Sequence, residues 1–178
     1  GNEDDIGYSI QQTSDGGLVI VGSTSSFGYG SYDILLLKIN SLNEHLTTIN
    51  VPDDFATIQE AIDYSIDGDT VLVSAGTYYE NIDFNGKNIS VIGEDRETTI
   101  IDGGQNGTVV LFSEGESSET LLSGFTIQNG LDGEGGGVEC NYGSSPTLND
   151  LIITNNIATL YGGGITIEQS SPVLSNII

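Results

Sequence analysis

The residues of this chain that could do chemistry are almost all acidic. Its 178 residues include 26 Asp and Glu against 3 Lys and Arg, a formal net charge of −23. Two loops concentrate these acids, one with Glu114, Glu116 and Glu119 and the other with Asp132 and Glu134. Carboxylate oxygens suit calcium, but the spacing matches neither an EF-hand loop nor a Gly-Gly-x-Gly-x-Asp calcium repeat. We interpret both as solvated loops. The sequence requires no cofactor and leaves calcium binding open.

The chain has one His and one Cys, which leaves little room for nucleophilic or metal chemistry. His45 lies in a polar stretch without a second His or a nearby Cys, so we expect a solvated histidine there. Cys140 has no partner for an internal disulfide, and a lone Cys is more often a small buried hydrophobe than a nucleophile. No Ser-His-Asp set is expected around His45.

Charge and hydropathy exclude two classes of partner. Three basic residues cannot neutralise a phosphate backbone, so no nucleic-acid partner is expected. No apolar run approaches the roughly 18 residues needed to span a bilayer. An anionic membrane surface repels a chain of this charge, so no membrane insertion is expected either.

The first 40 residues are predicted to form three antiparallel strands separated by turns. Alternating or apolar runs cover residues 8–13, 18–22 and 32–39, and Asp15-Gly16 between the first two is a strong hairpin signal. Three strands of this length leave two open edges and are marginal alone. The following residues, 41–52, are rich in Asn, Ser and Thr and are predicted to be a linker.

Residues 53–68 carry the one clear helix signal. Apolar residues recur at helical spacing: Phe55, Ile58, Ile62 and Ile66. Thr57 and Glu60 have the spacing of a capping box, and Gly68 suits the left-handed residue that follows a helix. We expect this short amphipathic helix to cover the apolar end of the β-structure that follows it.

From residue 70 onward a repeat of 26 residues organises the chain. Equivalent strand segments begin at Leu122, Leu148 and Leu174, each 26 residues after the one before. Ser-Ser-Pro recurs at 144–146 and 170–172 with the same period, and Gly-Gly-Gly recurs with a period of 27. A unit of short strands and turns cannot bury its apolar face alone, but stacked units can.

This period predicts a right-handed parallel β-helix with about four coils between residues 70 and 178. Equivalent strands would pair in parallel about 4.8 Å apart, so that aligned side chains form columns through the coils. The columns are Leu122, Leu148 and Leu174; Phe125, Leu151 and Ile177; Ile127 and Ile153; and Asn129 and Asn155. Stacked Asn side chains can hydrogen-bond to neighbours along their column.

Two parts of the chain resemble known families. The segment Asp4-Asp-Ile-Gly-Tyr-Ser-Ile-Gln-Gln-Thr-Ser-Asp-Gly-Gly-Leu-Val-Ile-Val-Gly22 with Tyr32-Asp-Ile-Leu-Leu-Leu-Lys-Ile39 resembles one blade of a secreted bacterial β-propeller repeat. A propeller needs roughly 4–8 blades of four strands, so none closes within this chain. The segments Asn50-Val-Pro-Asp-Asp-Phe-Ala-Thr-Ile-Gln-Glu-Ala-Ile62 and Gly76-Thr-Tyr-Tyr-Glu-Asn-Ile82 resemble the start of pectin-lyase-like β-helix proteins. The later repeats are similar to those of large secreted bacterial β-helix proteins.

One motif of this chain has a counterpart in a family that it resembles. Pectinesterases share a Gly-x-Tyr-x-Glu motif, which stands here as Gly76, Tyr78 and Glu80. The motifs that hold their catalytic aspartates do not occur in this chain. Their catalytic Arg has no counterpart either, because Arg96 is the only arginine and lies among acids at 94–97. We therefore expect Glu80 to be a structural residue near the cap, and we assign no catalytic residue.

The expected fold is all-β, with a propeller-like blade at 1–40, a linker at 41–52, and the cap and first coils of a β-helix at 53–178, truncated at its C-terminus. The expected function is a non-catalytic architectural or adhesive segment of a large secreted or cell-surface bacterial protein. Its expected partners are polysaccharide and the remaining domains of the full-length chain. The alternative is the N-terminal part of a carbohydrate-active enzyme, of pectinesterase or polysaccharide-lyase type, with its catalytic coils beyond residue 178.

Overall fold

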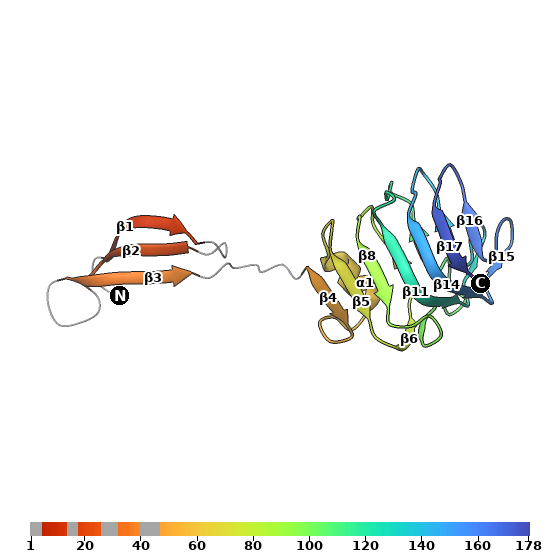
Figure 1. Ribbon diagram of the computed structural model, residues 1–178, viewed down its shortest axis with the longest axis horizontal. Coiled ribbons are helices and arrows are strands. Elements are labelled where there is room, and N and C mark those ends of the chain that lie inside the picture. Colours follow the sequence, from red (N-terminus) through yellow and green to blue (C-terminus); the bar gives the residue numbers. More distant parts are fainter. Residues whose placement is uncertain (1–4, 14–17, 26–31, 40–46) are drawn as a thin grey trace. The chain divides into compact units, whose positions relative to one another are not determined.

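The computed structural model describes residues 5–13, 18–25, 32–39 and 47–178. The chain divides into two compact units, Gly1–His45 and Leu46–Ile178. The first unit holds a three-stranded antiparallel sheet, and the second is a parallel β-helix with one short helix (Figure 1). The all-β architecture predicted from the sequence is therefore confirmed. His45 and the hairpin turn at 14–17 lie outside the described residues.

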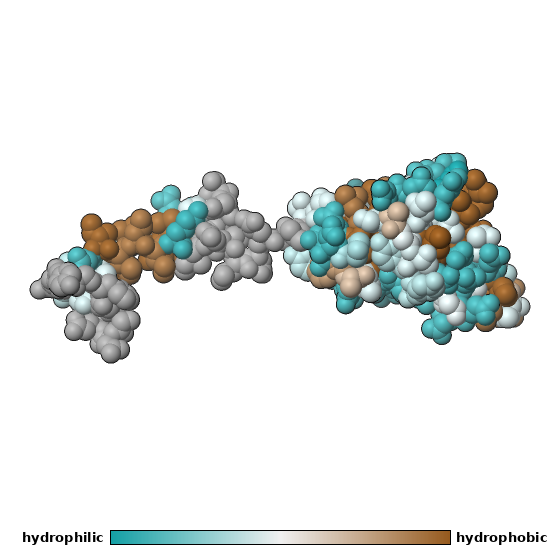
Figure 2. Space-filling model, turned by 90° about the horizontal axis from the view of Figure 1, so that it is seen from below, coloured by the Kyte–Doolittle hydropathy of each residue, from teal (hydrophilic) through white to brown (hydrophobic). Residues whose placement is uncertain are grey.

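The sheet of the first unit pairs its strands in chain order. It contains β1 (Asp5–Gln12), β2 (Leu18–Thr24) and β3 (Asp33–Ile39), with a register shift between Gly7 and Ser9. Leu36 and Leu37 are successive residues of β3 and so point to opposite faces, yet both are exposed. Both faces of this sheet therefore offer apolar surface. Figure 2 shows part of it in brown, on the side that faces the viewer.

The main sheet of the second unit carries one strand from each coil, and six strands follow one another in parallel (Figure 1). They are β4 (Thr48–Val51), β5 (Thr70–Val73), β8 (Ser90–Gly93), β11 (Leu121–Gln128), β14 (Thr147–Thr154) and β17 (Val173–Ile177). Six strands make five steps of one coil each, and four of these steps lie within residues 70–178, as the repeat predicts.

A second parallel sheet forms another flank of the β-helix. Its strands are β7 (Ile82–Asp83), β10 (Val110–Phe112), β13 (Val138–Cys140) and β16 (Ile165–Ile167). Two further parallel pairs join β6 (Gly76–Tyr79) to β9 (Thr99–Asp102) and β12 (Leu131–Asp132) to β15 (Ile157–Ala158). β9 also pairs with the second half of β11.

The register of the main sheet places the repeat positions on top of one another. Phe125 pairs with Leu151, and Leu151 pairs with Ile177, one coil apart. The same register joins the three leucines and the two isoleucines of the other columns: Leu122, Leu148 and Leu174, and Ile127 and Ile153. Of these side chains, Leu122, Phe125, Ile127, Leu148 and Leu151 are fully buried, Ile153 is partly buried, and Leu174 in edge strand β17 is 44% exposed.

The two asparagines of the repeat occupy equivalent turns but do not bond to each other. Asn129 and Asn155 both have a positive φ, 58° and 56°, which Asn tolerates better than most residues. The Asn129 amide donates instead to Asp102 Oδ2, 2.8 Å away. Burial raises the pKa of Asp102, but donors from Gly104, Gln128 and Asn129 outweigh it and hold this pKa below its usual value.

The helix is shorter than the 53–68 segment that the sequence predicts. Helix α1 spans Ile58–Tyr64, and Thr57 is its N-cap, with Thr57 Oγ1 accepting from the Glu60 amide at 3.2 Å. The expectation that Gly68 ends the helix is wrong. Ser65 turns to extended backbone, and its hydroxyl donates to Ala61 O. Gly68 has φ +92° in the turn before β5.

The predicted linker at 41–52 is wrong at its C-terminal end, because Thr48–Val51 forms β4 and pairs in parallel with β5. Ile49 and Val51 are fully buried, as are Ile58 and Ile62 of α1. Alternating apolar residues in so short a run gain their strand conformation from the neighbouring coil rather than from local propensity. Within the described residues, no helix has the length and apolar character needed to cross a membrane.

Candidate functional site

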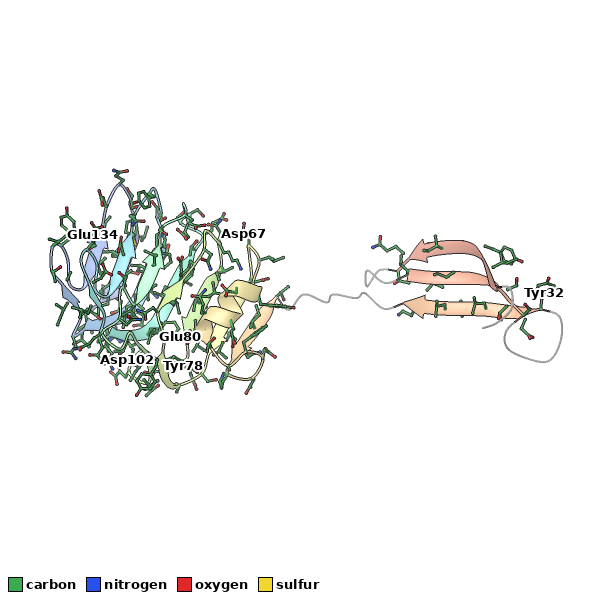
Figure 3. The ribbon with its side chains drawn as sticks, turned by 180° about the vertical axis from the view of Figure 1, so that it is seen from behind. Tyr32, Asp67, Tyr78, Glu80, Asp102 and Glu134 are labelled. Atoms are coloured by element: carbon green, nitrogen blue, oxygen red, sulfur yellow. The ribbon has the colours of Figure 1, made fainter. Side chains whose placement is uncertain are left out.

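Glu80, the last residue of the Gly-x-Tyr-x-Glu motif, lies beside the helix (Figure 3). Both carboxylate oxygens of Glu80 accept from the first turn of α1, Oε1 from the Ile58 amide at 3.0 Å and Oε2 from the Gln59 amide at 2.9 Å. The Tyr78 hydroxyl donates to Ser74 O at 2.9 Å. Burial, followed by the charges of Glu80 and Glu94, raises the Tyr78 pKa. Glu80 therefore satisfies amide groups that have no acceptor within the helix.

Replacing Glu80 is expected to lower stability. Glu80→Ala leaves two partly buried amides without an acceptor, which costs about 1–3 kcal/mol, whereas Glu80→Gln keeps one acceptor and costs less. Thermal unfolding of both variants and of the unchanged chain checks this order. A variant that loses pectin de-esterification while keeping its unfolding temperature would instead make Glu80 catalytic.

The two acidic loops differ from each other in the structure. Glu116 is fully buried and accepts from the Gly86 amide at 2.9 Å and from the Glu114 amide at 3.2 Å, so it is not the solvated residue expected from the sequence. Glu114 and Glu119 are exposed, as is Glu134, and Asp132 is half-buried. Within the described ranges, no three or more His, Cys, Asp or Glu side chains are grouped to hold a metal ion.

Two further residues that could take part in chemistry are ion-paired or buried: Arg96 and Cys140. Arg96 pairs with Asp150, 2.9 Å between Nη1 and Oδ1, rather than with the acids beside it in sequence. Cys140 is buried in β13, and burial, followed by the charges of Glu116 and Glu139, raises its pKa to about 12. A thiol with this pKa is a poor nucleophile at neutral pH.

A cleft of about 440 Å³ lies on the outer side of the second sheet. Its polar side chains come from consecutive coils: Asn81, Asp83, Asn106, Thr108, Ser113, Asp132, Glu139 and Asn141. Leu111 lies between two of them, because it pairs with Asp83 on one side and with Glu139 on the other. The exposed ring of Tyr142 also lines the cleft. No lysine or arginine of the described residues lines it.

Glu139 is the most perturbed acid of this cleft. Burial raises its pKa, and the charges of Glu134 and Asp132 add to the rise. Two donors partly offset these effects, the Thr108 hydroxyl at 3.3 Å from Oε2 and the Asn141 amide at 2.6 Å from Oε1. The structure thus brings the Asp132 loop close to a carboxylate that the sequence analysis did not single out.

The sequence holds one signal that points to this cleft. Residues 83, 111, 139 and 166 follow one another at 27 or 28 residues and occupy one outward row of the second sheet. The side chains along this row change from Asp to Leu to Glu to Thr, so a search for repeated residue types does not detect the row.

Comparisons with known proteins give one structural similarity. No family model and no curated protein matches the chain. Among solved structures, a pectin methylesterase mutant in complex with a hexasaccharide matches with a TM-score of 0.45 and 14% identity. The match covers 71% of this chain and 49% of the other, so this chain spans about half the length of that enzyme.

Proposed function

We propose that this chain is a non-catalytic architectural and adhesive segment of a secreted or cell-surface bacterial protein, and that it contacts polysaccharide along one flank of its β-helix. The observation that carries the proposal is the cleft on the second sheet. Its acids and amides can bond sugar hydroxyls, and Leu111 and Tyr142 offer apolar surface for the C–H faces of a sugar ring.

The repeat spacing supports an extended ligand. Asp83, Leu111 and Glu139 lie one coil apart, about 4.8 Å per step. This step is comparable to the length of one sugar unit in an extended chain. A polymer that follows the row could therefore repeat similar contacts from coil to coil.

Loss of the exposed ring at position 142 is expected to weaken polysaccharide binding. We expect Tyr142→Ala to raise the dissociation constant about fivefold, equivalent to about 1 kcal/mol, because one aromatic contact is lost. Titration calorimetry against a panel of neutral polysaccharides measures this. Tyr79→Ala is the matched control, since Tyr142 and Tyr79 are 74% and 79% exposed and only Tyr142 lines the cleft. Equal weakening by both variants, or no binding by any polysaccharide, would contradict the proposal.

Glu139 favours a second candidate function, that of a carbohydrate-active enzyme. A half-buried carboxyl whose pKa is raised inside a cleft is a possible general acid. Incubation with pectin, alginate and neutral polysaccharides, followed by assays for methanol, unsaturated uronate and reducing ends, separates the two functions. We expect no product from the chain, and turnover that Glu139→Gln abolishes would establish the second function.

A further inference from the structure

Three donors that line the cleft are already bonded within the chain. The Asn81 amide already donates to Thr108 O at 2.7 Å, the Thr108 hydroxyl to Gly135 O, and the Asn141 amide to Glu139 Oε1. The carboxylates of Asp83 and Glu139 keep further lone pairs, because each oxygen of an ionised carboxylate can accept more than one bond. Donor groups of a ligand can therefore bond to these carboxylates.

Asn141 supplies an observation that is independent of charge. Its side chain lines the cleft and reaches Glu139, and the residue is only 9% exposed. Within the described part of the chain, its Oδ1 has no hydrogen-bond partner. A buried carbonyl oxygen without a donor is unfavourable, so the chain itself leaves one acceptor in the wall of the cleft unsatisfied.

The negative charge around the cleft favours a positively charged hydrogen-bond donor. Glu134 and Asp132 lie close enough to Glu139 to raise its pKa, and no lysine or arginine among the described residues lines the cleft to offset these charges. Lys87 is held elsewhere, by Ile62 O and Asp63 O, each 2.7 Å away, and Arg96 pairs with Asp150. An acidic sugar would add a further negative charge here. An ammonium group carries only hydrogen-bond donors, and it neutralises one of the negative charges already present.

We propose that the cleft binds the protonated amine of a cationic amino sugar within a polysaccharide, with Glu139 as the principal counter-charge and Asp83 as the second. The proposal rests on the polysaccharide-binding function proposed above and names the class of sugar. Asp83 and Glu139 lie two coils apart on one row, about 9–10 Å, so each faces a different amine of an oligomer.

The test compares glucosamine hexamer with N-acetylglucosamine hexamer by titration calorimetry of the full chain at low and moderate salt. The two ligands differ in the charge of the amino group. The free amine is expected to bind about tenfold more tightly or better, because hydrogen bonds between charged partners are roughly twice as strong as neutral ones. The advantage should shrink as salt screens the charges. The Glu139 pKa, followed by NMR, should fall when the amine binds.

Two charge-neutralising variants locate the effect. Glu139→Gln and Asp83→Asn keep an acceptor and each remove one charge, so the glucosamine hexamer should lose most of its advantage over the acetylated hexamer. Glu119→Gln removes an equal charge from an exposed site outside the cleft and should leave the advantage intact. Thermal unfolding establishes that all three variants fold.

The outcomes separate this inference from the proposed function. Equal affinity for both hexamers, or equal losses in Glu119→Gln and Glu139→Gln, would overturn the amine specificity. Binding of neutral polysaccharide that depends on Tyr142 would still leave the proposed function in place. Absence of binding to every polysaccharide tested would overturn both.

Discussion

Replacing Leu151 with Asp is expected to unfold the coils on either side of it. Leu151 is fully buried in β14 between Phe125 and Ile177. The change removes buried apolar surface, which alone costs about 2–5 kcal/mol for Leu→Ala, and it adds an unpaired buried charge. That sum is a large part of the roughly 5–15 kcal/mol that stabilises a domain.

The stacked architecture predicts where this damage appears. Each coil contacts mainly its neighbours, so hydrogen exchange should lose protection first in β11, β14 and β17 and later in β4 and β5. Ile152→Asp is the matched control, because Ile152 is the next residue of β14, points to the opposite face and is only half-buried. If both variants lose protection equally, the inward column at Leu151 does not carry the stability assigned to it.

Replacing Gly136 with Ala is expected to cost about 1–3 kcal/mol or more, because it overpacks a backbone contact between coils. A Cβ atom at Gly136 would lie 2.6 Å from Ile157 O and 2.8 Å from Gly163 O. Both are backbone atoms, and neither can rotate away. The Gly-Gly-Gly repeat is thus explained by close packing: the Gly137 amide donates to Gly163 O at 2.9 Å.

The same loop contains the control for this prediction. A Cβ atom at Gly133 would meet no atom within 4 Å, so Gly133→Ala should unfold at the temperature of the unchanged chain or slightly above it. Calorimetry of the two variants measures the difference. Equal unfolding temperatures would mean that the coils can separate at Gly136 without cost.

The sequence by itself predicts the part of this fold that repeats. The 26-residue period places Phe125 one coil from Leu151 because an equivalent strand recurs at each turn of a solenoid, and a buried column needs apolar residues at each level. The Thr57–Glu60 spacing likewise locates the start of α1, because an N-cap is a local interaction. Local and periodic signals of this kind need no knowledge of the rest of the chain.

The sequence does not predict contacts between residues that share no period. Arg96 lies among acids in sequence, yet its ion pair is with Asp150. The Glu80 motif suggests chemistry, and only the tertiary structure shows both carboxylate oxygens of Glu80 occupied by amides of the first turn of α1. Such pairs depend on which coil lies next to which loop, and the residue types alone do not predict that arrangement.

The cleft belongs to the part that only tertiary structure decided. Asp83 and Glu139 come from coils two turns apart and meet on one row because β7, β10 and β13 pair in register. The repeat identifies inward positions, where burial demands similar apolar side chains, but outward positions are free to vary. The residues that line the cleft occupy those free positions, so their identities carry no periodic signal, and only the stacking of the coils brings them together.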